Sequence, residues 1–437
     1  MNSEIGGTKE KLTLFKYLKV AVPFILATIT QPLMGVVNTA VAGRLANPAT
    51  IAGVSVGAVI FNTMYWLLGF LRVSTTGFTA QAETLENDKE KAAVLYRPLL
   101  IAVLLGLLFV LLQKPIFSAS MLIINPDADV QMYTAQYYDI LIYGAPAVLI
   151  NYVILGWLMG RARTILAMIM QVSSNLLNIA LDFIMVFVFE LGVPGIAIAT
   201  LISQLLSLVL GVIFMLITKD FKLPPLKEIM EKKAFIHMLV VDLDLIGRTL
   251  CLLVQVNVFT AISASFGTIA LSANSILLQM KDLLTYPFEG LGNSASIFAG
   301  KATGNHDHEL LEQTIKVTLK SAVFTALLLS TVWFFFGNEI LSLFTDNADV
   351  LFAAREYRTW VTFFPIAAGF GMSIFGVFSG TSQTKPIRNS AIVALGVFLA
   401  VAYSSSGNNG LWLAVTLYYL IISVWQVIRS RSITRKL

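Results

Sequence analysis

One stretch of this chain places polar side chains at helical spacing inside an otherwise apolar run. Asp182 lies within the apolar segment 179–189, Asn178 precedes it by four residues and Asn175 by seven. At this spacing the three side chains share roughly one face of a helix. A carboxylate in the hydrocarbon interior costs at least about 2.5–3.5 kcal/mol on insertion scales, and such residues usually mark functional sites. The sequence therefore predicts an acid that gains and loses a proton, with a permanently hydrogen-bonded structural acid as the alternative.

A different set of ionisable residues lies in the second half of the chain. Lys281 and Asp282 fall mid-way in an apolar run, and Glu289 lies seven residues after Asp282. Charged groups at membrane depth must face protein or water. We expect these three residues, together with Asn175, to contact substrate, and a structural ion network is the equally weighted alternative.

Signatures of catalysis and of metal binding are absent from the sequence. His306 and His308 are two residues apart, whereas a helical zinc site needs histidines four apart. The single cysteine, Cys251, excludes an internal disulfide and a cysteine-based metal cluster. No GxxxxGK[ST] loop is present, so direct use of ATP is not expected. We predict neither an enzyme nor a protein with a metal site or cofactor.

The composition is that of a protein dissolved in lipid. Hydrophobic residues make up 57% of the 437 residues and charged residues 13%, and the mean hydropathy is +0.79. Soluble domains carry about 25% charged residues. The net charge of +5 comes from basic residues in short loops between apolar runs, so we expect the lipid bilayer, and not nucleic acid, as the partner.

Twelve apolar runs are long enough to cross about 30 Å of hydrocarbon as helices, which predicts an all-α polytopic membrane protein. They are 15–42, 51–80, 93–113, 133–160, 164–190, 193–217, 235–265, 269–300, 314–337, 353–380, 385–405 and 410–428. The first run is too long for a signal peptide and lacks a small-residue cleavage site. With the N-terminus inside, 23 of the 30 Lys and Arg residues lie in inward segments and four in outward segments. This bias predicts that both termini are cytoplasmic.

The chain also contains an internal duplication. The segment GWLMGRART at 156–164 reappears as GVFSGTSQT at 376–384, and residues 127–130 match 347–350 at the same offset of 220. We divide the chain into an N-terminal lobe (1–217), a cytoplasmic linker (218–234) and a C-terminal lobe (235–437). Six spans in each lobe make the repeat parallel, and duplicated membrane halves around a cavity are typical of alternating-access transporters.

Several motifs, in order, resemble those of the multidrug and toxic compound extrusion (MATE) family, and the second half resembles its DinF-type branch. The resemblance covers nearly the whole chain. The motifs are PLMGVVNTAVAGRL (32–45), TGFTAQ (76–81), QVSSNLLNIALD (171–182), GVPGIAIAT (192–200), DLIGRTL (244–250), and Glu289-Gly290 with GKATG (300–304).

This resemblance implies a V-shaped transporter of two six-helix lobes around a central cavity in a bacterial plasma membrane. It implies export of organic cations or amphipathic compounds by an antiporter that takes up protons, or less often sodium. We expect a monomer, since the sequence has no signal for oligomerisation. The family's coupling site maps onto Asn38, Asn178, Asp182 and Thr200.

Position 38 departs from the family pattern, which typically has an aspartate there. Asparagine cannot titrate near neutral pH, so Asn38 is either a deliberate substitution of that aspartate, which imitates its protonated form, or the mark of a member that couples differently. A lipid-linked precursor flippase of the same superfamily is the alternative function. Such proteins usually have fourteen spans and a basic cavity, and this chain has twelve spans and few cations within them.

Overall fold

The computed structural model describes residues 11–42, 44–45, 47–218, 225–345 and 347–434, without the side chains of 31–36, 39, 48 and 226. Part of the predicted linker, 219–224, therefore lies outside the described residues, as do the first ten residues of the predicted N-terminal lobe.

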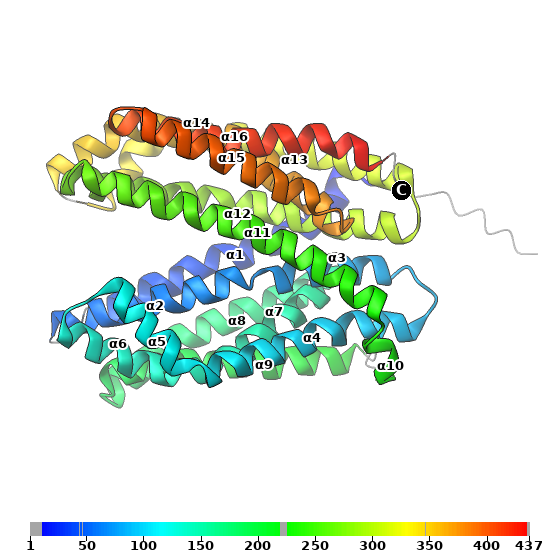
Figure 1. The fold of residues 1–437 in the computed structure, drawn as a ribbon, viewed down its shortest axis with the longest axis horizontal. Coiled ribbons are helices and arrows are strands. Elements are labelled where there is room, and N and C mark those ends of the chain that lie inside the picture. The colour runs from blue at the N-terminus through cyan, green and yellow to red at the C-terminus, as the bar shows by residue number, and fades with distance from the viewer. Residues whose placement is uncertain (1–10, 43, 46, 219–224, 346, 435–437) are drawn as a thin grey trace, which may run out of the picture. The chain divides into compact units, whose positions relative to one another are not determined.

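The described residues form helices joined by short turns (Figure 1). The elements are α1 (Leu14–Ala42), α2 (Pro48–Leu67), α3 (Phe70–Ala82), α4 (Asp88–Leu111), α5 (Gln113–Ile124), α6 (Ala128–Leu141), the 3-10 turn η1 (Ile142–Gly144), α7 (Ala145–Gly160), α8 (Thr164–Phe183), the π-helical turn η2 (Ile184–Val188), α9 (Gly192–Ile217), α10 (Leu226–Ile229), α11 (Lys232–Ser265), α12 (Thr268–Gly304), α13 (His308–Ser342), α14 (Ala348–Gly380), α15 (Lys385–Ser404) and α16 (Gly407–Ile433).

Each of the twelve predicted spans falls on one long helical segment. Among the described residues, ten segments are long and apolar enough to cross a membrane by themselves. The ten do not include α1, where several side chains are not described, or α12, which carries Lys281, Asp282 and Glu289. The all-α polytopic fold is thus confirmed.

Helix packing divides the chain into two compact units, which we describe separately. Of the described residues, those in 11–25 and 251–434 belong to unit 1, and those in 26–250 belong to unit 2. The fourth long helical segment of each repeat is central to its unit: α7 packs against α3, α4 and α9, and α14 packs against α12, α13 and α16. The unit boundaries lie within α1 and α11, whereas the predicted lobe boundary lies in the linker. The division into lobes stays a prediction.

The duplicated glycines explain how α7 and α14 approach their neighbours. A Cβ atom on Gly156 would lie 2.5 Å from the Arg72 backbone oxygen of α3, and one on Gly160 would lie 2.5 Å from the Thr79 side chain. On α14, Cβ atoms at Gly376 and Gly380 would collide with the backbone of α12. Small residues four apart allow two helix backbones to come this close. The duplicated segment is therefore a packing motif.

Helix ends also repeat with the offset of 220 residues. Asn87 caps the N-terminus of α4, and Asp307 caps α13 by accepting from the Leu310 amide at 3.0 Å. Ala162 and Ser382, which follow α7 and α14, have φ angles of 57° and 56°. His306 and His308 lie on either side of Asp307, the residue that caps α13. The described residues contain no group of three or more His, Cys, Asp or Glu side chains that could hold a metal ion.

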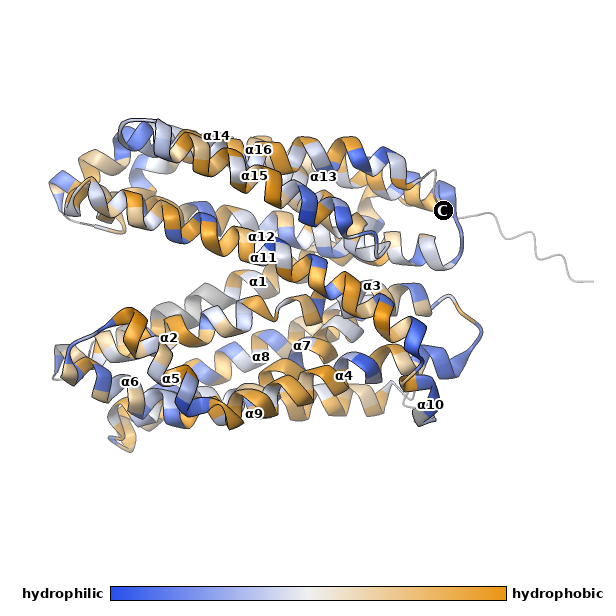
Figure 2. Ribbon diagram, viewed as in Figure 1, coloured by the Kyte–Doolittle hydropathy of each residue, from blue (hydrophilic) through white to orange (hydrophobic). Residues whose placement is uncertain are grey.

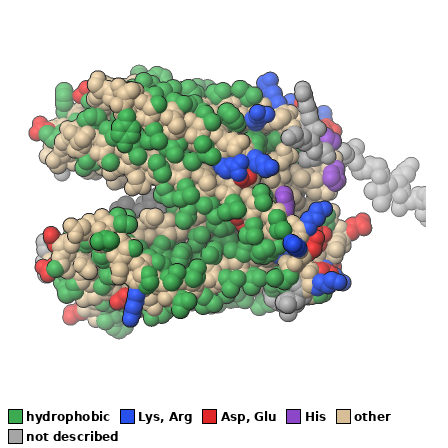
Figure 3. Space-filling model, viewed as in Figure 1, with side chains coloured by type: hydrophobic (Ala, Val, Ile, Leu, Met, Phe, Trp, Pro, Cys, Tyr) green, Lys and Arg blue, Asp and Glu red, His purple; other side chains and the backbone are tan. Residues whose placement is uncertain are grey.

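Hydrophobic residues predominate along the helices of both units (Figure 2), and apolar side chains cover much of the face drawn in Figure 3. Large hydrophobic residues are exposed along whole helices, including Leu104, Leu107 and Leu111 of α4 and Phe324, Leu327 and Phe335 of α13. Exposed apolar patches of this extent mark surfaces that contact a membrane or another protein. Together with the apolar helices, they fit a multi-pass membrane protein.

Candidate functional site

Asp182 lies near the end of α8, where the helix changes its winding. Its side chain is 0% exposed. The α-helix ends at Phe183, and the π-helical turn η2 follows directly. Single π-helical turns are rare in proteins, and many of those that occur lie at functional sites. The acid predicted from the sequence is therefore buried beside an irregular backbone segment that the sequence did not indicate.

The polar face of α8 contacts two other helices of unit 2. Asn178 is fully buried and donates from Nδ2 to the Thr200 hydroxyl of α9 at 3.0 Å. Thr200 in turn donates to the Ile196 carbonyl oxygen at 3.0 Å. One turn earlier on α8, Asn175 donates to the Thr30 hydroxyl of α1 at 2.8 Å. The predicted face is thus a polar seam that joins α8 to α9 and to α1.

Tyr137 of α6 completes this cluster and was not among the predicted site residues. It is 4% exposed, its side chain hydrogen-bonds Thr200, and Asp182 acts electrostatically on its hydroxyl group. Its ring covers Gly57 of α2, where a Cβ atom would lie 2.5 Å from the Tyr137 ring. The match between Tyr137 and Tyr357 in the duplication was the only available signal, and it did not distinguish a site residue from a packing residue.

Asn38 belongs to the same unit. It lies on α1, eight residues after Thr30, and its side chain is 9% exposed. We name Tyr137, Asn178, Asp182 and Thr200 the Asp182 cluster. Its members are buried in unit 2 and come from α6, α8 and α9, direct interactions join Tyr137, Thr200 and Asn178, and Asp182 acts electrostatically on Tyr137.

Lys281 of α12 forms a separate site in unit 1. Its side chain is almost completely buried, and its Nζ atom lies 2.8 Å from the Asp282 carboxylate and 3.4 Å from the Tyr419 hydroxyl. The same ammonium group lies 5.5 Å from the ring centre of Phe364 and 5.3 Å from that of Tyr419. Aromatic faces attract cations at these distances. The lysine is therefore held by one carboxylate and two rings.

Asp282 and Glu289 face a different environment from Lys281. The Asp282 side chain is 60% exposed, and Glu289 is half-buried. Both carboxylates act electrostatically on Tyr286, which lies between them on α12. The structure thus brings Asp282 close to Lys281 and places both acids around one tyrosine, in unit 1, whereas Asn175 lies in unit 2.

A second polar cluster in unit 1 joins α11, α12 and α16. Asn274 donates to the Ser263 hydroxyl at 2.6 Å and to the Asn408 side-chain oxygen at 2.7 Å. Its own oxygen accepts from Asn408 Nδ2 and Trp412 Nε1, both at 2.9 Å. Because both polar atoms of the Asn274 amide have partners, we interpret this cluster as a structural connection between helices.

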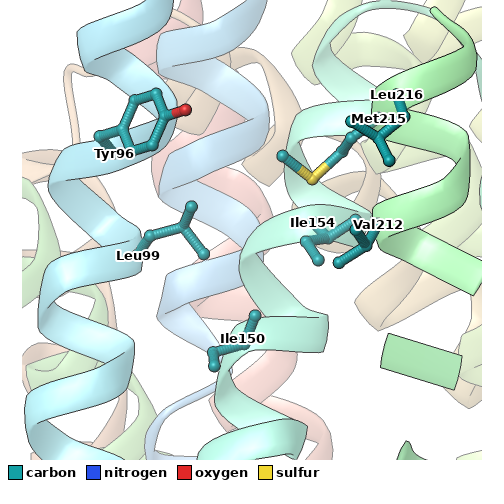
Figure 4. A pocket seen from close by; sticks show the side chains of 7 residues that line it. All are labelled: Tyr96, Leu99, Ile150, Ile154, Val212, Met215 and Leu216. Carbon is teal, nitrogen blue, oxygen red and sulfur yellow. The ribbon is translucent and has the colours of Figure 1, made fainter. Parts of the chain in front are cut away.

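An apolar pocket of about 240 Å³ lies between α4, α7 and α9 of unit 2 (Figure 4). Hydrophobic side chains line it, and the Tyr96 hydroxyl is the one polar side-chain group among its lining residues. Known ligand sites are larger, about 300–1,000 Å³, and have several polar groups that orient the ligand. The pocket therefore does not mark the site, and none of the predicted site residues lines it. The lining residues are Tyr96, Leu99, Ile150, Ile154, Val212, Met215 and Leu216.

Comparisons with known proteins agree with the duplication. The MatE family model matches the chain twice, at residues 23–184 and 245–404. DNA damage-inducible protein F of Escherichia coli (strain K12) is 32% identical over 404 residues, which cover 91% of this chain and 88% of that protein. Protein DETOXIFICATION 43 of Arabidopsis thaliana is 25% identical over 490 residues, with 95% and 92% covered.

Solved structures share the fold. The structure described as the outward-facing conformation of a multidrug resistance MATE family transporter of the MOP superfamily has a TM-score of 0.87 with this chain. The two chains are 18% identical, and 96% of each is covered. The family resemblance and the two-repeat helical fold are therefore confirmed, and this chain belongs to the MatE family, whose members are membrane transporters and not enzymes.

Proposed function

We propose that this transporter exports organic cations or amphipathic compounds in exchange for protons, and that Asp182 carries the proton. The observation that carries the proposal is the Asp182 cluster, in which a fully buried acid lies among hydroxyl and amide groups beside a π-helical turn. The description of one similar structure as a multidrug resistance transporter supports the substrate class.

The chemistry of the cluster suits a carboxyl group that changes its protonation state. Burial without solvent favours the neutral acid, because an ionised carboxylate loses its hydration. The hydroxyl groups of Tyr137 and Thr200 can reorient to donate or accept, and the Asn178 amide can do both at once. When water reaches the cluster from one side of the membrane, Asp182 can release its proton there. Alternating access then makes proton uptake and substrate export mutually dependent.

Asn38 extends the proposal to α1. An asparagine at this position can donate and accept hydrogen bonds as a protonated aspartate does, but it cannot release a proton. Under this proposal the chain carries one proton at Asp182, and an Asn38→Asp variant would add a further buried carboxyl group, on α1. Sodium is the alternative coupling ion, because carboxylate, hydroxyl and amide oxygens also suit hard cations.

Drug-driven proton movement in proteoliposomes tests the proposal. We expect that a cationic dye added to one side of the vesicle membrane drives the release of protons to that same side. Asp182→Asn should abolish that release. Asn38→Asp in the same assay separates the two interpretations of position 38. If Asn38→Asp transports and the parent chain does not, Asn38 is an inactive coupling position.

Two controls decide between the coupling ions and between the function classes. Replacing a sodium gradient by a potassium gradient leaves proton-coupled transport unchanged and abolishes sodium-coupled transport. If no variant moves protons or sodium against the dye, antiport is refuted, and translocation of a fluorescent lipid-linked precursor becomes the next assay for the flippase alternative.

A further inference from the structure

A second buried acid lies outside the Asp182 cluster, on α11 of unit 2. Asp242 is 3% exposed, and Ser74 of α3 is its hydrogen-bonding neighbour. The Oδ1 atom of Asp242 has no hydrogen-bond partner among the described residues. None of the ion pairs found in that part of the chain includes Asp242. A carboxyl group in such surroundings is more stable neutral than ionised.

The Ser74 hydroxyl hydrogen has two acceptors within reach, the Phe70 carbonyl oxygen and the Asp242 carboxylate. The Ser74 hydroxyl donates to the Phe70 carbonyl oxygen at 3.0 Å. A hydroxyl group has a single hydrogen to donate, so in this arrangement Ser74 offers Asp242 only its lone pairs. The bond between them then requires a hydrogen on the carboxyl group. An ionised Asp242 would need the Ser74 hydroxyl to turn away from Phe70.

No described cation compensates a charge on Asp242. The α3 helix has one charged residue, Arg72, which acts on Tyr152. Beyond the end of α3, Glu83 pairs with Arg161 at 3.0 Å. On α11, the other titratable or charged groups near Asp242 are His237, Asp244 and Arg248. Each of them interacts with a partner other than Asp242. Ionisation of Asp242 would therefore bury an uncompensated charge unless α11 and α3 separate and water enters.

The contact between α11 and α3 has a counterpart in unit 1, at the offset of the duplication. In unit 2, His237 of α11 packs edge-on against Phe78 of α3, with ring centres 5.7 Å apart. In unit 1, Tyr17 of α1 stacks on Phe298 of α12 at 6.1 Å. Both residues of each pair match those of the other at an offset of 220.

The serine of the contact is duplicated, but the acid is not. Ser294 of α12 matches Ser74 at the same offset and donates to the Tyr17 carbonyl oxygen at 3.4 Å. The position that matches Asp242 is occupied by Val22. Of the two contacts, the one in unit 2 therefore has a carboxyl group where the other has an apolar side chain.

We propose that Asp242 is a second proton-exchange residue, which fastens α11 to α3 when it is protonated and releases α11 when it is ionised. Loss of the proton to water leaves a carboxylate that must be hydrated, and rebinding of a proton restores the bond to Ser74. The role of this step in export rests on the proton-coupled function proposed above, but the protonation of Asp242 does not.

Infrared difference spectroscopy between acidic and alkaline pH, on purified protein in nanodiscs, tests the protonation directly and involves no transport. We expect a C=O band of a protonated carboxyl group that is lost in Asp242→Asn and shifted in frequency in Ser74→Ala. Asp244→Asn removes a neighbouring buried acid, and Ser294→Ala removes the duplicated serine, so both should keep the band. A spectrum of Asp242→Asn identical to the parent spectrum overturns the proposal.

Hydrogen exchange measured by mass spectrometry tests the release of α11. After correction for the intrinsic effect of pH, we expect amides of α3 and of the first turns of α11 to exchange faster at alkaline pH in the parent. Asp242→Asn, which cannot ionise, should abolish that increase, and Asp242→Leu provides a second neutral variant. Equal exchange in the parent and in both variants refutes the release. Failure of dye transport with these results intact would refute only the proposed function.

Discussion

At the scale of single residues, Tyr137 is the side chain whose role the structure makes testable. We predict that Tyr137→Phe lowers dye-driven proton release, because it removes the hydroxyl that hydrogen-bonds Thr200 and lies close to Asp182. The variant should fold, since one neutral hydrogen bond contributes only about 0.5–1.5 kcal/mol. Proton release in proteoliposomes and the melting temperature in detergent measure the two effects separately.

The adjacent tyrosine is a matched control for this prediction. The Tyr138 hydroxyl donates to the Gln113 carbonyl oxygen at 3.0 Å, outside the Asp182 cluster. Tyr138→Phe should have a similar effect on the melting temperature and leave proton release unchanged. Equal proton release in the two variants would show that the Tyr137 hydroxyl has no part in coupling.

Lys281 and Asp282 should respond unequally to the loss of their partner. Asp282→Asn leaves a buried ammonium group without its carboxylate, whereas Lys281→Met leaves a carboxylate whose side chain is 60% exposed. Removal of one partner of a buried pair is costly because the remaining charge stays buried. We therefore predict that Asp282→Asn lowers the melting temperature more than Lys281→Met does. The opposite order would mean that Lys281 reaches solvent in the folded protein.

At the scale of elements, the close contact between α14 and α12 is the most sensitive to a small change. A methyl group on Gly376 would collide with the Gly292 backbone, which cannot move aside as a side chain can. We predict that Gly376→Ala destabilises the protein by about 1–3 kcal/mol, the usual range for overpacking. Thermal unfolding in detergent measures this loss.

Gly396 is the control on a neighbouring helix. A Cβ atom there meets nothing within 4 Å. Gly396→Ala should stabilise α15 by about 0.5–1 kcal/mol, because alanine loses less backbone freedom in a helix. If both variants shift the melting temperature alike, helix propensity decides the effect and not the contact between α14 and α12.

Two basic residues of α4, Lys89 and Arg97, contact the described part of the linker, and the Lys89 ammonium lies 3.6 Å from the Glu228 carboxylate. Arg97 of α4 is 6% exposed and donates to the carbonyl oxygens of Glu228 at 2.8 Å and Ile229 at 3.2 Å. It also lies 3.8 Å from the Glu231 carboxylate. These bonds satisfy carbonyl groups at the end of α10, which is too short to be stable by itself.

We predict that Arg97→Gln frees α10 and accelerates cleavage by trypsin after Lys227. Lys316→Gln, which removes an exposed ion pair with Glu312 at 2.6 Å, should leave the cleavage rate unchanged. Digestion followed by mass spectrometry measures both rates. An unchanged rate in Arg97→Gln would show that the backbone of α10 holds without the arginine.

At the scale of the whole molecule, the distribution of basic residues predicts the orientation in the membrane. In a Cys251→Ser background, Ser406→Cys should react with an impermeant maleimide on intact cells. Asn305→Cys should react only after the membrane is opened. Both positions are exposed and belong to segments predicted to face opposite sides. The reverse labelling would place both termini outside and refute the topology.

The class of the protein, the number of long helices, the duplication and the family were all predictable from the amino-acid order. These properties depend on patterns that are read along the chain: apolar runs of membrane length, basic loops, and segments that recur after 220 residues. The face of α8 was also predictable, because side chains four residues apart on a helix must lie together. Asp182 and Asn178 are buried on that face, as their spacing indicated.

The contacts between residues of separate helices, in contrast, depend on the packing of the fold. Tyr137 joins the Asp182 cluster from α6, and Asp242 meets Ser74 across 168 residues of sequence. Neither pairing follows from a local pattern, because it depends on how helices cross and on which faces the glycine contacts bring together. The duplicated glycines were the clearest repeat in the sequence. Because glycine has no side chain, these residues cannot take part in chemistry, and they instead allow the helices to pack closely.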